Sequence, residues 1–186
     1  MRAAGSDADE TWRALSDSLE QTWTQLDARL AGLTDTEALW EPVADCWSVR
    51  ASPNGSVTAD WLDGPDDPDP APVTTIAWRL WHIAVDCLDS YSARAFDRTG
   101  TGLHATAWVL ETSRARDLLR QAWQVFVAGL ETRAPDGLYE LLGPQWRGDA
   151  DKTYLALALH AQREVVHHGA EIALLRDLYR GHGLGS

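Results

Sequence analysis

Histidine and glutamate side chains recur every fourth residue in the segment HAQREVVHHGAE, which spans positions 160–171. Because residues four apart share one face of a helix, His160, Glu164 and His168 form a single row. Successive helical residues turn by about 100°, which places leucine and isoleucine side chains beside this row and directs it toward the interior. A charged carboxylate is costly to bury unless it is paired or binds a metal ion. The spacing therefore predicts a divalent metal site on this helix.

A second helix must supply another ligand, and the segment TIAWRLWHIA at 75–84 offers His82. This histidine lies about 100° from the main apolar stripe of its helix. Two imidazoles and a carboxylate suit zinc, nickel or ferrous iron, of which we expect zinc. Three protein ligands leave coordination positions open, as in catalytic sites. The spacing leaves open whether His160 or Glu164 is the ligand beside His168.

The remaining histidines are weaker candidates for metal ligands. His167 lies about 60° from Glu164, on the other side from His168, where it is either a surface residue or a neighbour of the ligands. We expect no role at the site for His104, at the start of a predicted helix, or for His182, in the tail.

The two cysteines, Cys46 and Cys87, are too few for a disulfide framework or a thiolate zinc site. Cys87 falls on the apolar stripe of its helix, where a free cysteine usually packs as a small hydrophobic residue. Neither cysteine has a histidine at a recognisable spacing, so we do not expect a catalytic cysteine.

The composition is that of an ordinary globular protein. A chain of 186 residues is long enough for one well-packed domain. Its residues are 45% apolar and 24% charged, as in typical globular proteins. A net charge of −12 and a single lysine, Lys152, argue against nucleic-acid binding. There is no long apolar run for a membrane span, and the acidic N-terminus lacks the apolar core of a signal peptide. We therefore expect a single-domain cytoplasmic protein over residues 1–186.

Apolar side chains at helical spacing predict four long helices, whose expected ranges are 7–33, 74–97, 104–132 and 149–180. The first should begin with Asp7 or Ser6 as its cap, with Glu10 in the capping-box position three residues after Asp7, and the second with Thr74 or Thr75 as its N-cap. Four helices of this length predict an all-α four-helix bundle, in which metal sites arise from side chains on facing helices.

The connectors between these helices differ greatly in length. Residues 34–73 form a long connector, in which we expect a helical turn near 36–40 and a small hairpin around 47–61. Its acidic, proline-rich part at 63–72 should be a solvated loop. The shorter segment 135–144 should be a loop with one helical turn.

Four segments, taken in order, resemble the DinB superfamily of metal-binding four-helix proteins. These segments are GLTDTEALWEP at 32–42, WSVR at 47–50, IAWRLWHIA at 76–84 and REVVHHGAEI at 163–172. The resemblance implies one ligand from a histidine on the second helix and two from a four-spaced pair on the last. It therefore assigns the metal ligands to His82, Glu164 and His168. Since the usual pair is two histidines, the set with a glutamate is similar to the mycothiol-dependent maleylpyruvate isomerase branch.

The resemblance implies a metal-dependent transferase or isomerase that acts with a low-molecular-weight thiol such as mycothiol. The ion would hold the sulfur as a thiolate, which then attacks an electrophilic carbon of a small-molecule substrate. His160 and His167 are candidate proton shuttles. Alternative functions are a hydrolase that activates metal-bound water and a non-catalytic metal-binding stress-response protein. A homodimer is a further expectation.

Three residues are candidates for binding the cosubstrate or its acceptor. Trp78 and Trp47 could wall an apolar pocket. Arg79 could meet a substrate carboxylate, although we expect this arginine at the surface. Roughly 25 residues lie between WSVR and the second helix, a long insertion for such a connection, and we expect it to change the rim of the pocket.

Overall fold

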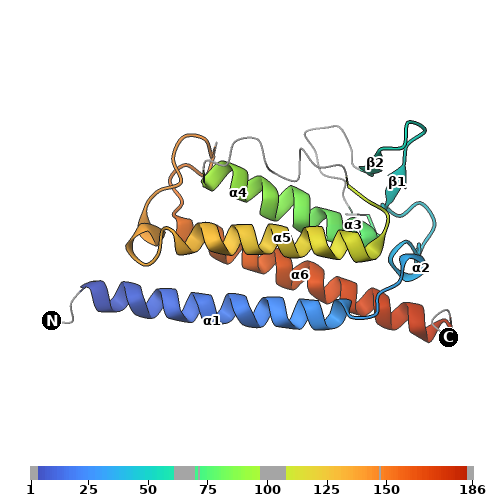
Figure 1. Ribbon diagram of the computed structural model, residues 1–186, viewed down its shortest axis with the longest axis horizontal. Coiled ribbons are helices and arrows are strands. Elements are labelled where there is room, and N and C mark those ends of the chain that lie inside the picture. The colour runs from blue at the N-terminus through green and yellow to red at the C-terminus, as the bar shows by residue number, and fades with distance from the viewer. Residues whose placement is uncertain (1–3, 61–69, 71, 97–107, 147, 184–186) are drawn as a thin grey trace.

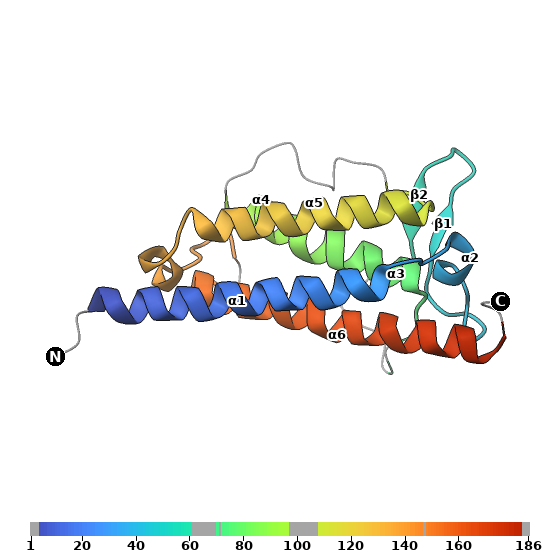
Figure 2. The ribbon, with the colours of Figure 1, turned by 60° about the horizontal axis from the view of Figure 1, so that its bottom comes forward.

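The computed structural model describes residues 4–60, 70, 72–96, 108–146 and 148–183, and this part of the chain is an all-α bundle. Its long helices are α1 (Ala4–Leu30), α5 (Thr112–Glu131), α6 (Tyr154–Gly181) and a continuous run of α3 (Ile76–Trp81), η1 (His82–Asp89) and α4 (Ser90–Ala95). Figures 1 and 2 show α1 lying along α6, and α5 lying along the α3–η1–α4 run. The predicted fold class is confirmed.

The core lies between these four helical segments, each of which contributes fully buried side chains. Leu19 comes from α1, Ile83 from η1, Phe126 from α5 and Ile172 from α6. Each side chain of this size contributes about 1.5–3 kcal/mol when it leaves water. The predicted apolar stripes therefore face one another and hold the bundle together.

The second long helix contains a π-helical stretch that the sequence did not predict. Its start is as expected, because the Thr75 side chain accepts a hydrogen bond from the Trp78 backbone N–H at 3.2 Å. From His82 to Asp89 the backbone is π-helical, and the run ends at Ala95, two residues before the predicted end. π-Helical turns are rare and are frequent at functional sites. This one begins at a predicted metal ligand.

The predicted starts of three long helices are wrong. α1 begins at Ala4, so Asp7 lies inside its first turn and does not form the predicted capping box. α5 begins at Thr112, because residues 108–111 are not helical; His104 lies outside the described residues. α6 begins at Tyr154, a few residues later than predicted, where the Thr153 side chain caps it.

The predicted ends are closer to the observed ones. α1 ends at Leu30, and the left-handed φ of +68° at Gly32 turns the chain away before the predicted end at Leu33. α5 and α6 each end within about a turn of the predicted residue.

The connector holds the two predicted elements. The helical turn is α2 (Asp35–Ala38), and the hairpin is formed by β1 (Val49–Ala51) and β2 (Val57–Ala59), which pair antiparallel with Val49 opposite Ala59. Most of the acidic loop at 63–72 lies outside the described residues. The predicted turn within 135–144 is a single 3₁₀ turn, η3 (Asp136–Tyr139).

The insertion leaves the junction between WSVR and the second helix closed. The Trp47 N–H donates to the Val73 carbonyl at 2.9 Å, and the Thr75 N–H donates to the Trp47 carbonyl at 2.8 Å. The Ser48 and Thr75 hydroxyls also lie 3.0 Å apart. The two ends of the insertion therefore lie next to each other, beside the start of α3.

The segment around α2 ties three long helices together. Asp35 accepts a hydrogen bond from the Thr112 N–H at 2.7 Å and so caps α5 from a distance. Glu37, 5% exposed, pairs with Arg176 of α6, 3% exposed, through contacts of 2.7 and 3.1 Å. Arg176 also donates to the carbonyls of Arg29 and Ala31, at the end of α1. The acidic residues of the GLTDTEALWEP segment thus have structural roles.

Replacing Asp35 with alanine is expected to destabilise the protein by about 1 kcal/mol, the usual value of a lost helix cap. The Thr112 N–H lowers the pKa of the Asp35 carboxyl. Its stabilising effect is therefore complete above the pKa of the unfolded carboxyl and disappears as the pH falls through the lower, folded pKa. Urea unfolding at neutral and acid pH measures both effects. Asp17→Ala, on the exposed face of α1, is the control; equal stability of the two variants at neutral pH would contradict the role of Asp35 as a cap.

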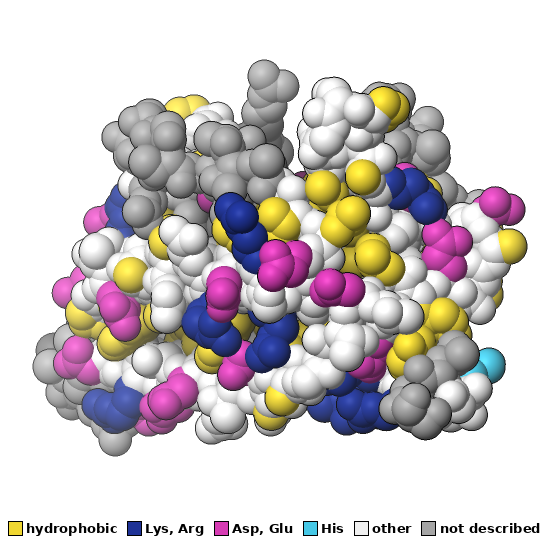
Figure 3. Space-filling view, turned by 45° about the vertical axis from the view of Figure 1, so that its right-hand side comes forward, with side chains coloured by type: hydrophobic (Ala, Val, Ile, Leu, Met, Phe, Trp, Pro, Cys, Tyr) yellow, Lys and Arg dark blue, Asp and Glu magenta, His cyan; other side chains and the backbone are white. Residues whose placement is uncertain are grey.

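The surface carries both signs of charge. On the face shown in Figure 3, acidic and basic side chains are interspersed among small apolar patches. None of the described helices combines the length and apolar character needed to cross a membrane.

Candidate metal centre

His82 is held in place by its own helix. Its ring stacks on the Trp78 ring with 5.0 Å between centroids and 11° between planes, and its side chain is 14% exposed. Nδ1 lies 3.1 Å from Oδ2 of Asp86, one turn further on. A carboxylate at Nδ1 favours the proton there, which leaves the lone pair of Nε2 for a metal ion.

His168 is oriented by Glu171 of its own helix, α6, and by Arg79 of the facing helix α3. Its Nδ1 lies 2.7 Å from Glu171, whose carboxylate is held in turn by Arg79 at 3.0 and 3.2 Å. A guanidinium nitrogen of Arg79 also lies 3.1 Å from this Nδ1. The same nitrogen cannot accept from Arg79 and donate to Glu171, and the shorter, charge-assisted contact favours donation to Glu171. Nε2 of His168 is then the unprotonated nitrogen.

The electrostatics keep His168 in the form that binds a metal. Burial lowers the pKa of His168, although the hydrogen bond with Glu171 acts in the opposite direction, so the imidazole is neutral. Burial alone would raise the pKa of Glu171, but the hydrogen bond with His168 and the charge of Arg79 outweigh it and lower that pKa. Neutral imidazole is the ligand form of histidine.

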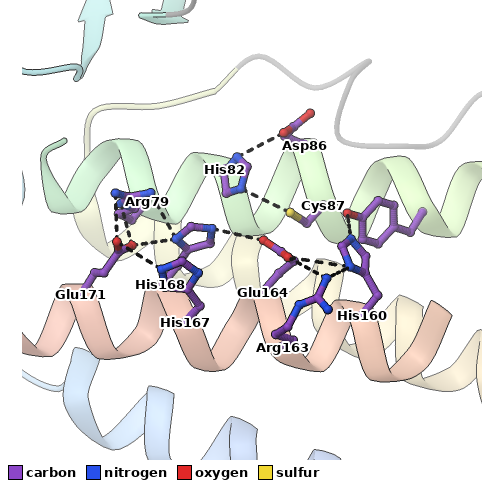
Figure 4. A network of polar contacts seen from close by, with 11 residues as sticks. Arg79, His82, Asp86, Cys87, His160, Arg163, Glu164, His167, His168 and Glu171 are labelled. Carbon is purple, nitrogen blue, oxygen red and sulfur yellow. Dashed lines mark hydrogen bonds and ion pairs between the residues drawn. The ribbon is translucent and has the colours of Figure 1, made fainter. Parts of the chain in front are cut away.

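Glu164 lies beside both histidines. Its Oε2 is 3.3 Å from Nε2 of His168, and one of its oxygens lies within 4.8 Å of donor atoms of both His82 and Cys87. The His82 and His168 rings are perpendicular, with centroids 4.6 Å apart. Figure 4 shows these side chains pointing toward one another from η1 and α6. The structure therefore brings together the three predicted ligands; that they hold a metal stays a prediction.

Cys87 joins this group, although the sequence indicated only a core residue. Its Sγ is 3.5 Å from Nε2 of His82, and its side chain is buried. Residues five apart point about 140° away from each other on an α-helix. The i→i+5 hydrogen bonding of a π-helix brings them to the same side, which no helical-wheel argument for an α-helix predicts.

Two distances within the group agree with the spacing of ligands around a zinc-sized ion. Zinc bonds of roughly 2.0–2.3 Å at tetrahedral angles place a nitrogen ligand about 3.3–3.6 Å from a neighbouring oxygen or sulfur ligand. The Cys87–His82 distance of 3.5 Å and the Glu164–His168 distance of 3.3 Å agree with this spacing. Without a cation, burial and the charges of Asp86 and Glu164 raise the pKa of the Cys87 thiol to about 12.

A second set of donors, His167, His168 and Glu171, also lies within 4.8 Å. It is a weaker candidate, because Glu171 is already paired with Arg79 and the His167 side chain is 62% exposed. His167 stacks on His168 with centroids 4.8 Å apart, on the outer side of the ligand row.

His160 lies one turn before Glu164, as its spacing predicts. Its Nδ1 is 3.8 Å from Glu164, its Nε2 is 2.9 Å from the Tyr91 hydroxyl, and Arg163 contacts its Nδ1. Burial lowers the pKa of His160 and raises that of Tyr91. His160 is therefore neutral and adjoins the ligand group.

The predicted binding residues have mixed outcomes. Trp78 is buried and donates its indole N–H to the Asp60 carbonyl at 2.8 Å, and Trp47 packs on it at 5.7 Å between centroids. Trp78 thus stacks on His82, and Trp47 packs on Trp78. Their role in binding a ligand stays a prediction. The expectation of an exposed Arg79 is wrong, because its side chain is 15% exposed and paired with Glu171.

Sequence reasoning gave no role to Glu171, Cys87 or Tyr91. Glu171 was detectable, because it lies three residues after His168 and such pairs meet on a helix. Cys87 and Tyr91 had no comparable signal.

The fold and this group of donors define a four-helix bundle with residue groups that could hold a metal ion between facing helices. The family model of the DinB superfamily matches residues 18–172, and the chain belongs to this superfamily. The resemblance drawn from the sequence is thus confirmed at the level of the superfamily. No curated protein and no solved structure matches the chain.

Proposed function

We propose that this protein is a divalent-metal-dependent transferase or isomerase that uses a low-molecular-weight thiol of the mycothiol type as cosubstrate. The observation that carries the proposal is the convergence of His82, His168 and Glu164 from two helices, with each imidazole oriented by its own carboxylate. A bound ion would keep the cosubstrate thiol as a thiolate at neutral pH.

In this proposal, residues of the protein bind the metal ion, and others orient those ligands. His82 and His168 offer their Nε2 atoms, and the Glu164 carboxylate lowers the net charge of the site. The Arg79–Glu171 pair keeps the proton of His168 on Nδ1, away from the ligand position. These contacts fix the geometry before any ligand arrives.

The properties of two further residues support the proposal that the nucleophile is the thiol of the cosubstrate. The Cys87 thiol, with its pKa raised to about 12, is a poor nucleophile at neutral pH unless a cation lies beside it. His160 is neutral and close to Glu164, which makes it the better placed of the two predicted proton shuttles to accept the proton of an incoming thiol. His167 is more exposed, and its Nε2 lies 3.5 Å from Glu171 rather than beside Glu164.

The test is turnover of the metal-loaded protein with and without thiol. Protein purified without a metal-chelating tag is first analysed for its elements, and we expect zinc near one equivalent. Consumption of an α,β-unsaturated acid is then followed in the presence of mycothiol, of cysteine or of no thiol, with metal-free protein as the control. We expect turnover that requires both metal and thiol. Cleavage of an activated ester without thiol, measured in parallel, would instead indicate a metal-dependent hydrolase, and no turnover of either substrate would leave a non-catalytic metal-binding protein.

A further inference from the structure

A cavity of about 750 Å³ opens beside the ligand group, within the usual size range for small-molecule sites. Its walls are the start of α4, the segment 142–152 and the first turns of α6. Tyr91 and His160 line it on the side of Glu164, so the cavity and the candidate metal centre are neighbours.

The charge of this cavity is opposite to that of the whole chain. Acidic residues outnumber basic ones by 28 to 16 in the sequence. Among the described residues that line the cavity, three are basic, Arg94, Lys152 and Arg163, and one is acidic, Asp149. The only lysine of the chain is one of the three. A cavity with this lining favours an anion.

The basic side chains keep donors available for a ligand. Arg94 donates to the Ser90 hydroxyl at 2.9 Å and lies over the Trp146 ring at 4.8 Å, which fixes the plane of its guanidinium. Lys152 pairs with Asp149 at 2.6 Å, and its ammonium has further donors. Each arginine has five N–H donors in a fork that matches a carboxylate.

The rest of the lining is largely apolar. Leu142, Leu157, Leu159 and Trp146 contribute to it, and Leu159 is 52% exposed. Within the part of the chain that the structure describes, the buried indole N–H of Trp146 has no hydrogen-bond partner. The leucines and the Trp146 ring offer an apolar surface on which a ligand can pack.

We propose that this cavity binds a small organic carboxylate with an apolar body, and that this ligand is the acceptor substrate. Arg94 and Lys152 would hold the carboxylate, and the leucines and Trp146 would pack on the body. The other end of the ligand would then face Tyr91 and His160, next to Glu164. Its role as acceptor rests on the proposed function, but its binding requires neither metal nor thiol.

The test is calorimetric binding of 4-phenylbutanoate to the full-length protein, with 4-phenylbutanamide as the neutral analogue of the same shape. We expect the acid to bind roughly ten-fold more tightly than the amide, as for a charge-assisted hydrogen bond. Arg94→Gln and Lys152→Gln should each raise the dissociation constant of the acid roughly ten-fold. Arg120→Gln, on α5 and paired with Asp27 and Asp117, should leave it unchanged.

Several outcomes would overturn the proposal. Equal binding of acid and amide would show that charge is not recognised, and wild-type affinity in both glutamine variants would show that the acid binds elsewhere. Absence of binding at millimolar acid would exclude the cavity as a carboxylate site. Circular dichroism melting shows whether a variant that no longer binds the acid is still folded. Because the titration uses metal-free protein without thiol, it can fail while thiol-dependent turnover succeeds, and the reverse.

Discussion

Replacing His82 or His168 with alanine is expected to remove most of the bound metal, with a loss of affinity of at least a hundred-fold. Each substitution deletes one imidazole beside Glu164, since His82 lies in one group of donors with Glu164 and Nε2 of His168 lies 3.3 Å from it, and a three-ligand site does not tolerate the loss of one nitrogen well. Element analysis and competition with a chromophoric chelator measure occupancy and affinity. His182→Ala, in the exposed C-terminal turn, is the control. Stoichiometric metal in His82→Ala would exclude a site shared between the two helices.

Variants of Glu164 and His160 decide which is the ligand on α6. Glu164→His should keep the ion, because histidine has the right reach and the superfamily resemblance implies histidine at this position. It should nonetheless change activity, because the net charge of the site rises by one and a bound thiolate becomes less nucleophilic. If Glu164→His and His160→Ala both lose the ion, the ligand set is His82, His160 and His168 instead.

Cys87→Ser shows whether the thiol is a ligand or a neighbour. If Cys87 binds the ion, cobalt-loaded wild-type protein shows a thiolate charge-transfer band that the serine variant lacks. If both proteins lack the band, Cys87 lies beside the site and only packs there. Metal occupancy of the serine variant is measured at the same time, so that a lost band is not confused with a lost ion.

Replacing Arg176 with alanine is expected to destabilise the protein by about 3–5 kcal/mol, the usual cost of leaving one member of a buried ion pair without its partner. Glu37 is 5% exposed, so its carboxylate would stay in the interior without a cation. The same substitution also removes the donors that Arg176 gives to the carbonyls of Arg29 and Ala31. Urea unfolding followed by circular dichroism measures the loss.

Two further experiments test whether the unpaired buried charge, and not another effect of the substitution, causes the loss of stability. Arg180→Ala, a half-exposed arginine on the same helix, should change stability by less than about 0.5 kcal/mol. The double variant Glu37→Met with Arg176→Met should recover most of the stability, because apolar replacement of both partners is often neutral. A double variant as unstable as Arg176→Ala would show that packing, not charge, dominates at this position.

Much of the fold follows from local sequence patterns. Apolar spacing identified the four long helices and the faces that they bury, and Thr75 marked the start of the second. The hairpin and the turn at α2 were also predicted. These features depend on residues close together in the sequence, where helical or strand periodicity already determines which side chains share a face. The confirmed membership of the DinB superfamily rests on the same segments.

The helix boundaries were less predictable for a physical reason. α5 begins where Asp35, from another part of the chain, satisfies the Thr112 N–H, and the sequence around position 112 does not identify this partner. Capping by a distant side chain obeys the same hydrogen-bond requirement as local capping. It leaves no pattern in the sequence around the helix.

The sequence by itself determined the bundle and the helical row of His160, Glu164 and His168, because both depend on local periodicity. Only the tertiary structure decided which groups surround that row. The π-helical stretch brought Cys87 to His82, and facing helices placed Arg79 on Glu171. The cavity and its basic lining exist only where α4, α6 and the segment 142–152 meet. Such contacts join residues far apart in the chain, so the physical cause of each is packing in three dimensions rather than spacing along the sequence.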